Sequence, residues 1–183
     1  MARYETAPYR VVAKDGPYEL RAYDGFHTAT IDSSSWQGSG GFSQIFQYIS
    51  GSNETSEKIS MTTPVLNEIA PGQSTTEFVM PASYNEKNLP EPSDPSIRIR
   101  YHQPCLAAVI RFSGSVNDEK IEKNRILLSN WIQRKGMETL GALRLARYNP
   151  PFIPPFLRRN ELLLDVAEMI GSEDGSVETP HIR

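Results

Sequence analysis

The chain has 183 residues, of which 38% are apolar and 22% charged, and its formal net charge is −3. This length suits one domain with a core of its own, and without a basic excess to neutralise phosphates we expect no nucleic-acid partner. The single cysteine, Cys105, excludes an internal disulfide. No apolar run approaches the roughly 20 residues that span a bilayer and no signal peptide is visible, so we expect a cytoplasmic protein.

The first half of the chain is expected to place strands around one short helix. Residues 18–23 and 26–31 alternate between apolar and polar side chains, and Asp24-Gly25 separates them, which predicts a bent strand or a hairpin. A helix over 42–49 follows, and Ser50-Gly51 supplies its end.

Two further strands complete this half. One is predicted over 58–69, where Pro64 lacks an N–H and marks an edge or a bulge. The other covers 77–80. The segment 85–96 is punctuated by prolines and predicts an irregular connection.

The second half repeats the order of the first. Its predicted elements are strands over 97–101 and 106–112, a helix from Asn117 or Asp118 to about Lys135, and strands over 140–148 and 161–166. Two such β-α-β-β units bury their helices most easily against a common antiparallel sheet.

We therefore predict one α+β domain over residues 1–170. Its expected architecture is a distorted antiparallel β-barrel or sheet core flanked by two helices and built from two repeats. Residues 171–183 are polar and acidic, and they predict a disordered tail.

The sequence lacks the motifs of metal, nucleotide and nucleophile sites. No Cys/His cluster, glycine-rich phosphate loop or GxSxG motif is present. The three histidines, His27, His102 and His181, are scattered, and such histidines are usually structural or surface residues. We assign no catalytic residue and no metal ligand, and we lean towards a protein without enzymatic activity.

The candidate site is apolar. One face of the first predicted helix is formed by Phe42, Ile45, Phe46 and Ile49. Such a stripe is most often ordinary core, but Tyr48 broadens the aromatic surface. The helix also begins after the glycine-rich segment 38–41, where bare backbone permits close approach of a ligand. A shallow apolar groove here would suit a flat aromatic ligand.

Four more residues complete the candidate set of ligand contacts: Met61, Tyr148, Arg158 and Arg159. Met61 is an adaptable apolar residue that packs either a ligand or the core. Arg158 and Arg159 follow the proline-rich loop 149–156. They either close that loop by bonding to its backbone and pairing with acids, or meet a carboxylate of the ligand.

These residues resemble the SOUL haem-binding family. The matching segments are ordered along about residues 17–167, and each is weak alone while together they are specific. They are Phe42-x-x-Ile45-Phe46-x-Tyr48-Ile49-x-Gly51-x-Asn53, Lys58-Ile59-Ser60-Met61-Thr62-Thr63-Pro64-Val65, Phe78-Val79-Met80-Pro81, Pro90-x-Pro92 with Asp94, Arg111-Phe112-Ser113-Gly114, Tyr148-Asn149-Pro150-Pro151, and Pro155-Phe156-Leu157-Arg158-Arg159-Asn160-Glu161.

The resemblance implies haem or another tetrapyrrole as the ligand, held beside the first helix with basic residues near its propionates. At the matching positions this chain has Ser39, Gln47 and Ile153, none of which is cationic. Ala22 stands where some members carry a histidine proposed as an iron ligand. The apolar half of a haem site is therefore retained, and its charged half is not identified.

Three hypotheses follow. The first is a carrier or buffer that binds a tetrapyrrole in an apolar groove beside the first helix. The second is an enzyme or sensor for another small apolar molecule, which would need a buried carboxylate or tyrosine, with Glu77, Tyr148 and Glu161 as candidates. The third is a module that covers the same apolar face with a protein partner or, as a homodimer, with a second copy.

Overall fold

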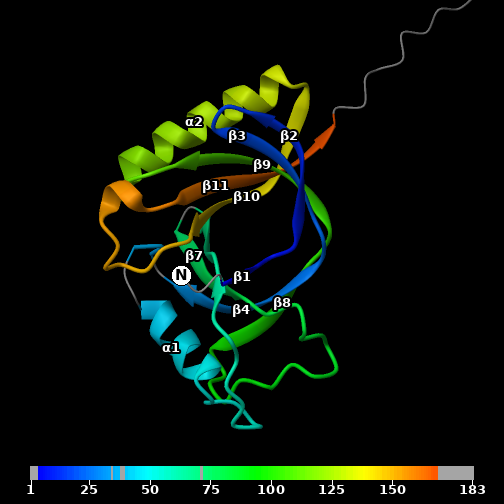
Figure 1. Cartoon of the computed structure of the whole chain (residues 1–183), viewed down its shortest axis with the longest axis vertical. Coiled ribbons are helices and arrows are strands. Elements are labelled where there is room, and N and C mark those ends of the chain that lie inside the picture. The colour runs from blue at the N-terminus through cyan, green and yellow to red at the C-terminus, as the bar shows by residue number, and fades with distance from the viewer. Residues whose placement is uncertain (1–3, 34, 38–39, 71, 169–183) are drawn as a thin grey trace, which may run out of the picture.

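One nine-stranded antiparallel sheet carries both α-helices found among the described residues (Figure 1). The computed structural model describes residues 4–33, 35–37, 40–70 and 72–168, so the expected tail lies outside the described residues. The helices are α1 (Gly40–Ile49) and α2 (Asp118–Arg134). The strands are β1 (Glu5–Thr6), β2 (Tyr9–Asp15), β3 (Tyr18–Tyr23), β4 (Phe26–Ser33), β5 (Thr62–Thr63), β6 (Val65–Ala70), β7 (Gln73–Val79), β8 (Ile97–His102), β9 (Cys105–Phe112), β10 (Met137–Arg147) and β11 (Asn160–Glu168).

The sheet repeats one arrangement twice, which confirms the predicted α+β fold. Its strand order is β2-β3-β9-β11-β10-β6-β7-β4-β8. The sheet divides into two quartets in which β3, β9, β11 and β10 correspond, in that order, to β8, β4, β7 and β6. The two quartets meet where β10 pairs with β6. Because β2 and β8 form the two edges, the sheet is open and not a closed barrel.

The two quartets exchange a strand. β3 and β4 are consecutive in the chain, but β3 pairs with β9 while β4 pairs with β7 and β8. The bend at Asp24-Gly25 is therefore not a hairpin, since it sends the chain from one quartet to the other. A side chain at Gly25 would collide with Tyr101 of β8, because an added Cβ would lie 1.9 Å from the tyrosine hydroxyl oxygen.

α2 begins and ends where the sequence predicts, and α1 ends at the predicted Ile49 but begins two residues earlier, at Gly40. Asn117 caps α2 by accepting the Lys120 N–H at 2.8 Å. Beyond the helix, Gly136 adopts a φ of +66°, the left-handed conformation that commonly follows a helix end. α1 closes with backbone bonds from Ser50 and Gly51 to its last turn.

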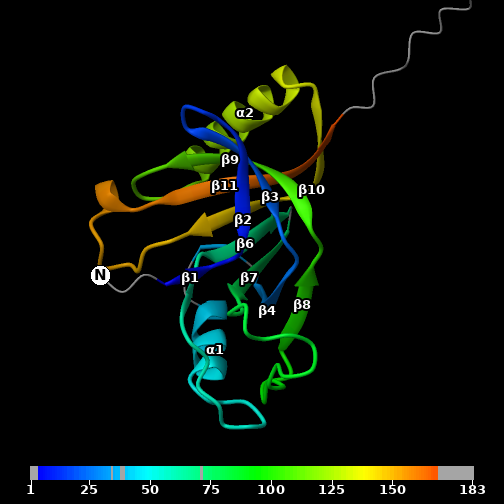
Figure 2. The ribbon, with the colours of Figure 1, turned by 45° about the vertical axis from the view of Figure 1, so that its right-hand side comes forward.

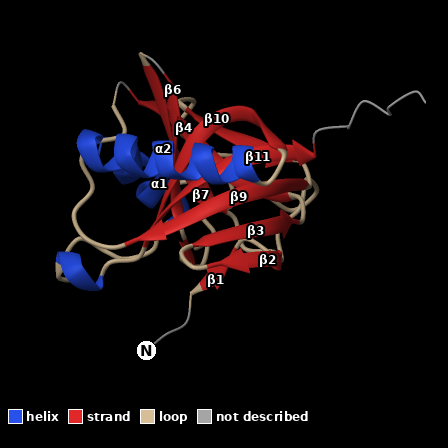
Figure 3. Ribbon diagram, turned by 90° about the horizontal axis from the view of Figure 1, so that it is seen from above, coloured by secondary structure: helices blue, strands red, loops and turns tan. Residues whose placement is uncertain are grey.

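Three apolar clusters hold the sheet and helices together. α1 packs over β4 and β7, where Ile45 and Ile49 join Ala29, Ile31 and Phe78 in one cluster. α2 lies across β9, β11 and β10 in Figure 3 and buries Leu128, Trp131 and Ile132 against them. We call this helix-bearing side the outer face. The inner face carries a third cluster that includes Tyr23, Phe26, Leu66 and Leu163.

Two strand predictions need correction, and neither of the first two strands, β1 and β2, is predicted from the sequence. The strand expected over 58–69 is split by a cis Thr63-Pro64 bond into β5 and β6, and residues 58–61 are not part of a strand. The strand expected over 77–80 begins earlier, at Gln73.

Neither helix in the described ranges is long and apolar enough to cross a membrane.

Candidate functional site

α1 divides its apolar residues between the core and the surface. Ile45 and Ile49 are 0% and 3% exposed, and they point into the cluster above β4 and β7. Phe46 is 50% exposed, and Phe42 is partly buried beside it. Their ring centroids lie 6.3 Å apart at an interplanar angle of 32°. The helix thus has an aromatic flank with little of its own chain over it.

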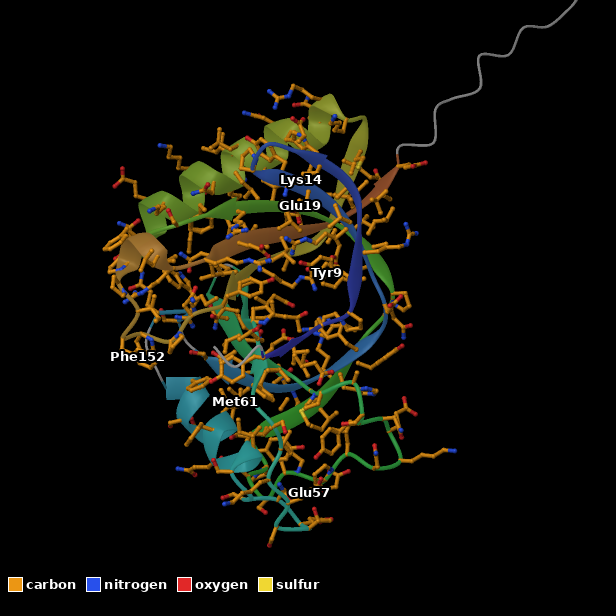
Figure 4. All side chains as sticks on the ribbon, viewed as in Figure 1. Tyr9, Lys14, Glu19, Glu57, Met61 and Phe152 are labelled. Atoms are coloured by element: carbon orange, nitrogen blue, oxygen red, sulfur yellow. The ribbon has the colours of Figure 1, made fainter. Side chains whose placement is uncertain are left out.

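Met61 extends this apolar surface beyond the helix. It is labelled over α1 in the view of Figure 4, and its side chain is 36% exposed. The segment is fixed on both sides of it, because Ile59 donates its N–H to the carbonyl of Ile49 at 2.8 Å and the Thr62 hydroxyl donates to the carbonyl of Val79.

The proline loop between β10 and β11 exposes further aromatic side chains. Phe152 is 81% exposed and Phe156 is 74% exposed. Figure 4 shows Phe152 at the tip of the loop, on the same side of the molecule as α1. Arg158 closes the loop by donating to the carbonyls of Ile153 at 2.7 Å and Pro151 at 2.6 Å. The hydrogen bonds of Arg158 therefore fix the loop backbone, while the rings of Phe152 and Phe156 remain exposed.

Tyr148 and Arg159 lie in a different environment from the α1 surface. Both contact Glu161, which is 0% exposed, with the Tyr148 hydroxyl at 2.8 Å and Arg159 Nη2 at 2.7 Å. Arg21, 1% exposed, adds a bidentate pair to the same carboxylate. Tyr148 also lines a space with Tyr23 on the inner face. The structure thus separates Tyr148 from Phe42, Phe46 and Met61.

The inner face holds a second buried carboxylate, Glu77. Its oxygens meet His102 Nε2 at 2.7 Å, the Thr28 hydroxyl at 3.1 Å and the Thr75 hydroxyl at 3.1 Å. Arg100 Nη1 lies 3.4 Å away. Burial opposes the ionisation of this carboxyl, but hydrogen bonds and the neighbouring positive charges outweigh it, so the pKa of Glu77 is lowered.

Glu161 follows the same pattern. Burial again acts against the charged form, and the contacts from Arg21 and Arg159 override it, so its pKa is lowered as well. A general acid needs a carboxyl with a raised pKa. Both candidate carboxylates of the enzyme hypothesis are instead held ionised in ion pairs.

Two cavities among the described residues are small. The cavity that Tyr23, Phe26 and Tyr148 line has a volume of about 10 Å³, room for about one water molecule. A second, beside His27 and Tyr84, measures about 50 Å³. Pockets for drug-sized ligands measure about 300–1,000 Å³. Neither of these two cavities has room for a tetrapyrrole.

No group of three or more metal-ligating side chains is found in the described part of the chain. His102 is bound to Glu77, and His27 packs against Tyr101 with ring centroids 4.8 Å apart. His181 lies outside the described residues.

Arg147 is a residue that sequence reasoning missed. It ends β10 and donates to Asn67 Oδ1 at 2.7 Å. The sequence places Arg147 at the end of a predicted strand, just before the proline loop, and this position could have suggested a role at the site. An arginine at the end of a strand is ordinarily exposed, so its partial burial could not be predicted.

Comparison with known proteins adds the family. The sequence matches the SOUL heme-binding protein family over residues 4–165. It is 27% identical over 158 residues to heme-binding protein 2 of Mus musculus, covering 80% of this chain and 77% of that protein. It is also 27% identical over 180 residues to heme-binding protein 1 of Sus scrofa, covering 87% and 92%.

Solved structures support the fold alone. The C-terminal domain of EcmrR is similar with a TM-score of 0.61 at 12% identity, covering 88% of this chain and 99% of that one. A hydrolase from Listeria innocua has a TM-score of 0.59 at 11% identity, covering 85% and 94%. The family match spans nearly all of the described domain, and this chain belongs to the SOUL heme-binding protein family.

Proposed function

We propose that the protein binds haem or another tetrapyrrole without catalysing a reaction, on the outer face beside α1. The observation that carries this proposal is the aromatic flank of α1, where Phe42 packs beside the half-exposed Phe46. The segment that carries the exposed Met61 is bonded to the end of the same helix through Ile59. Membership of a family whose relatives are named heme-binding proteins supports the choice of ligand.

The described residues fit one face of a flat apolar ligand. Phe46 and Met61 are exposed enough to contact it directly, Phe42 lies at its edge, and the buried Ile45 and Ile49 fix the helix beneath. Covering a porphyrin face of about 200–300 Å² at about 25 cal/mol/Å² gives roughly 5–8 kcal/mol before the costs of association. This predicts a Kd in the micromolar range.

The polar residues of the candidate set already make hydrogen bonds within the described chain. Arg158 bonds to loop carbonyls and Arg159 to Glu161. A role for either arginine, or for Tyr148, at the ligand requires the proline loop to rearrange. Bound haem would supply its iron, and the residues described above would orient the macrocycle and exclude water from one face.

Titration with haemin, read in the Soret band, tests the proposal. Phe46→Asp should weaken binding about tenfold, because it removes apolar contact and places a charge against the ligand. Ile126→Asp is the matched control, since Ile126 is 46% exposed on α2, away from the proposed site. No spectral change at tens of micromolar haemin, or equal affinity of both variants and the wild type, would refute the proposal.

A second copy of the chain covering the same face is the alternative. Light scattering with and without haemin separates the two. A monomer that stays monomeric with haemin supports the proposal, while a dimer that forms without haemin and dissociates in Phe46→Asp supports the alternative. We also propose a cytoplasmic location, to be tested by cell fractionation.

A further inference from the structure

Arg147 lies on the strip of sheet between the two helices. On β10 it pairs with Val65 of β6 and with Asn160 of β11. Val65 in turn pairs with Phe78, which is buried under α1, and Asn160 pairs with Phe112, which packs at the α2 cluster.

Directly paired residues share a face, so this row runs across the outer face. At about 4.8 Å between strands, Arg147 stands roughly 10 Å from β7 beneath α1, while its own strand β10 contacts α2 at residues earlier in the strand. Figure 2 shows β10 and β6 in this intermediate position.

The guanidinium of Arg147 makes a hydrogen bond but no ion pair among the described residues. Its one hydrogen bond within the described chain goes to Asn67 Oδ1 at 2.7 Å. Asn67 is 0% exposed, and its amide nitrogen donates to the Thr75 carbonyl at 3.1 Å and the Thr76 hydroxyl at 3.0 Å. These two bonds fix the amide oxygen towards Arg147, so the guanidinium is oriented in advance.

The other well-buried arginines of the described chain have carboxylate partners. Arg21 pairs with Glu161, and Arg144 pairs with Asp165. Arg147, partly buried, has no acid within ion-pair distance among the described residues, and burial alone lowers its pKa. A guanidinium carries five N–H donors, and a cation withdrawn from water is stabilised when an anion takes up the remaining donors.

We propose that Arg147, oriented by Asn67, binds a carboxylate of the ligand that lies against α1. This inference rests on the proposed function and supplies the charged half of that site. A tetrapyrrole with acidic side chains on one edge would place its ring on Phe42 and Phe46 and that edge towards β10. Arg147 then makes a charge-assisted, bidentate contact, which an ammonium group reproduces only in part.

The test compares haemin with its dimethyl ester, in which both carboxylates are blocked, against wild type, Arg147→Met and Arg147→Lys. Haemin should bind Arg147→Met about tenfold more weakly than wild type, and Arg147→Lys should recover part of the loss. The dimethyl ester should bind wild type and Arg147→Met within about twofold of each other. Arg10→Met on the exposed edge strand β2 removes the same charge and should leave haemin affinity unchanged.

The outcomes separate this inference from the proposed function. If wild type binds haemin and Arg147→Met binds it equally well, the Arg147 contact is wrong and the proposed function stands. The same loss for haemin and for the ester also overturns the contact, because it shows a packing effect. If wild type binds neither ligand, the proposed function itself fails. Circular dichroism confirms that each variant is folded before it is titrated.

Discussion

The buried pair of Arg21 and Glu161 offers the sharpest test of how the inner face is stabilised. Arg21 reaches across 140 residues of sequence to make contacts of 2.8 and 2.9 Å with the two carboxylate oxygens. Removing one partner of a buried ion pair costs about 3–5 kcal/mol, because the other charge stays buried. Arg159 still contacts Glu161, so we expect Arg21→Met to cost about 3 kcal/mol, near the lower end.

Urea unfolding at about pH 7 measures this cost directly, and a protein of this size should lose about 6–12 °C in Tm. Arg98→Met is the matched control. It removes an arginine that also makes a bidentate cross-strand pair, with Asp32, but that pair is 59% and 48% exposed. Exposed pairs contribute less than about 1 kcal/mol. Equal losses in the two variants would refute the reasoning.

The pH dependence of the same pair has a defined sign. The pKa of Glu161 is lowered in the folded protein, so its ionised form stabilises the fold above the usual glutamate pKa, and this stabilisation is lost as the pH falls through the folded-state pKa. In Arg21→Met that pKa rises. The stability gap between wild type and variant should therefore be full at about pH 7 and shrink at about pH 4 and below. A gap that does not change with pH contradicts this account.

Two further predictions concern α1 and the ligand. Tyr48→Phe should cost about 1–2 kcal/mol in urea unfolding, because the buried hydroxyl donates to the Pro90 carbonyl at 2.7 Å and the carbonyl would be left without its donor; an unchanged stability would contradict this. Metal-free protoporphyrin should bind within about threefold of haemin by fluorescence quenching, since the proposed site rests on apolar contact and a carboxylate and uses no iron ligand. A preference for haemin above tenfold would point to axial ligation.

Helices were predictable because each carried its own end signals. For α2, the sequence predicts Asn117 as a possible N-terminal cap and Gly136 as the stop, and both residues have these positions in the structure. β2 was missed because it is an edge strand whose residues 10–15 are all exposed, so no face is selected to be apolar. The pairing of β3 with β9 could not be predicted, since local alternation says nothing about a partner strand 82–92 residues away.

The site was predictable only in its apolar part. A helical stripe in the sequence marks Ile45 and Phe46 alike, and only packing shows that the first is buried and the second is half exposed. The charged residues were harder, because Arg21 occupies an ordinary polar position in an alternating strand. Arg21 is buried because the fold brings Glu161 to it. Arg147 is bonded to an amide oxygen and, among the described residues, the fold brings no acid to it.

The duplication supports our proposal that the ligand lies on the outer face. Glu77 lies opposite Thr30, and its partner His102 lies opposite a residue four positions earlier on β4. Glu161 lies opposite Arg111, and its partner Arg21 again lies opposite a residue four positions earlier on β9.

Both repeats therefore place a buried glutamate with a basic partner at matching positions of the inner face, and a cavity of about 10 Å³ lies beside Tyr148, which contacts Glu161. Buried charges that already have partners leave no attraction for an acidic ligand there. On the outer face the repeats meet at β10 and β6, where Arg147 has no acid partner in the described chain and the aromatic flank of α1 is open. We therefore propose that an acidic tetrapyrrole lies on the outer face, with its ring against the flank of α1 and its carboxylates towards Arg147.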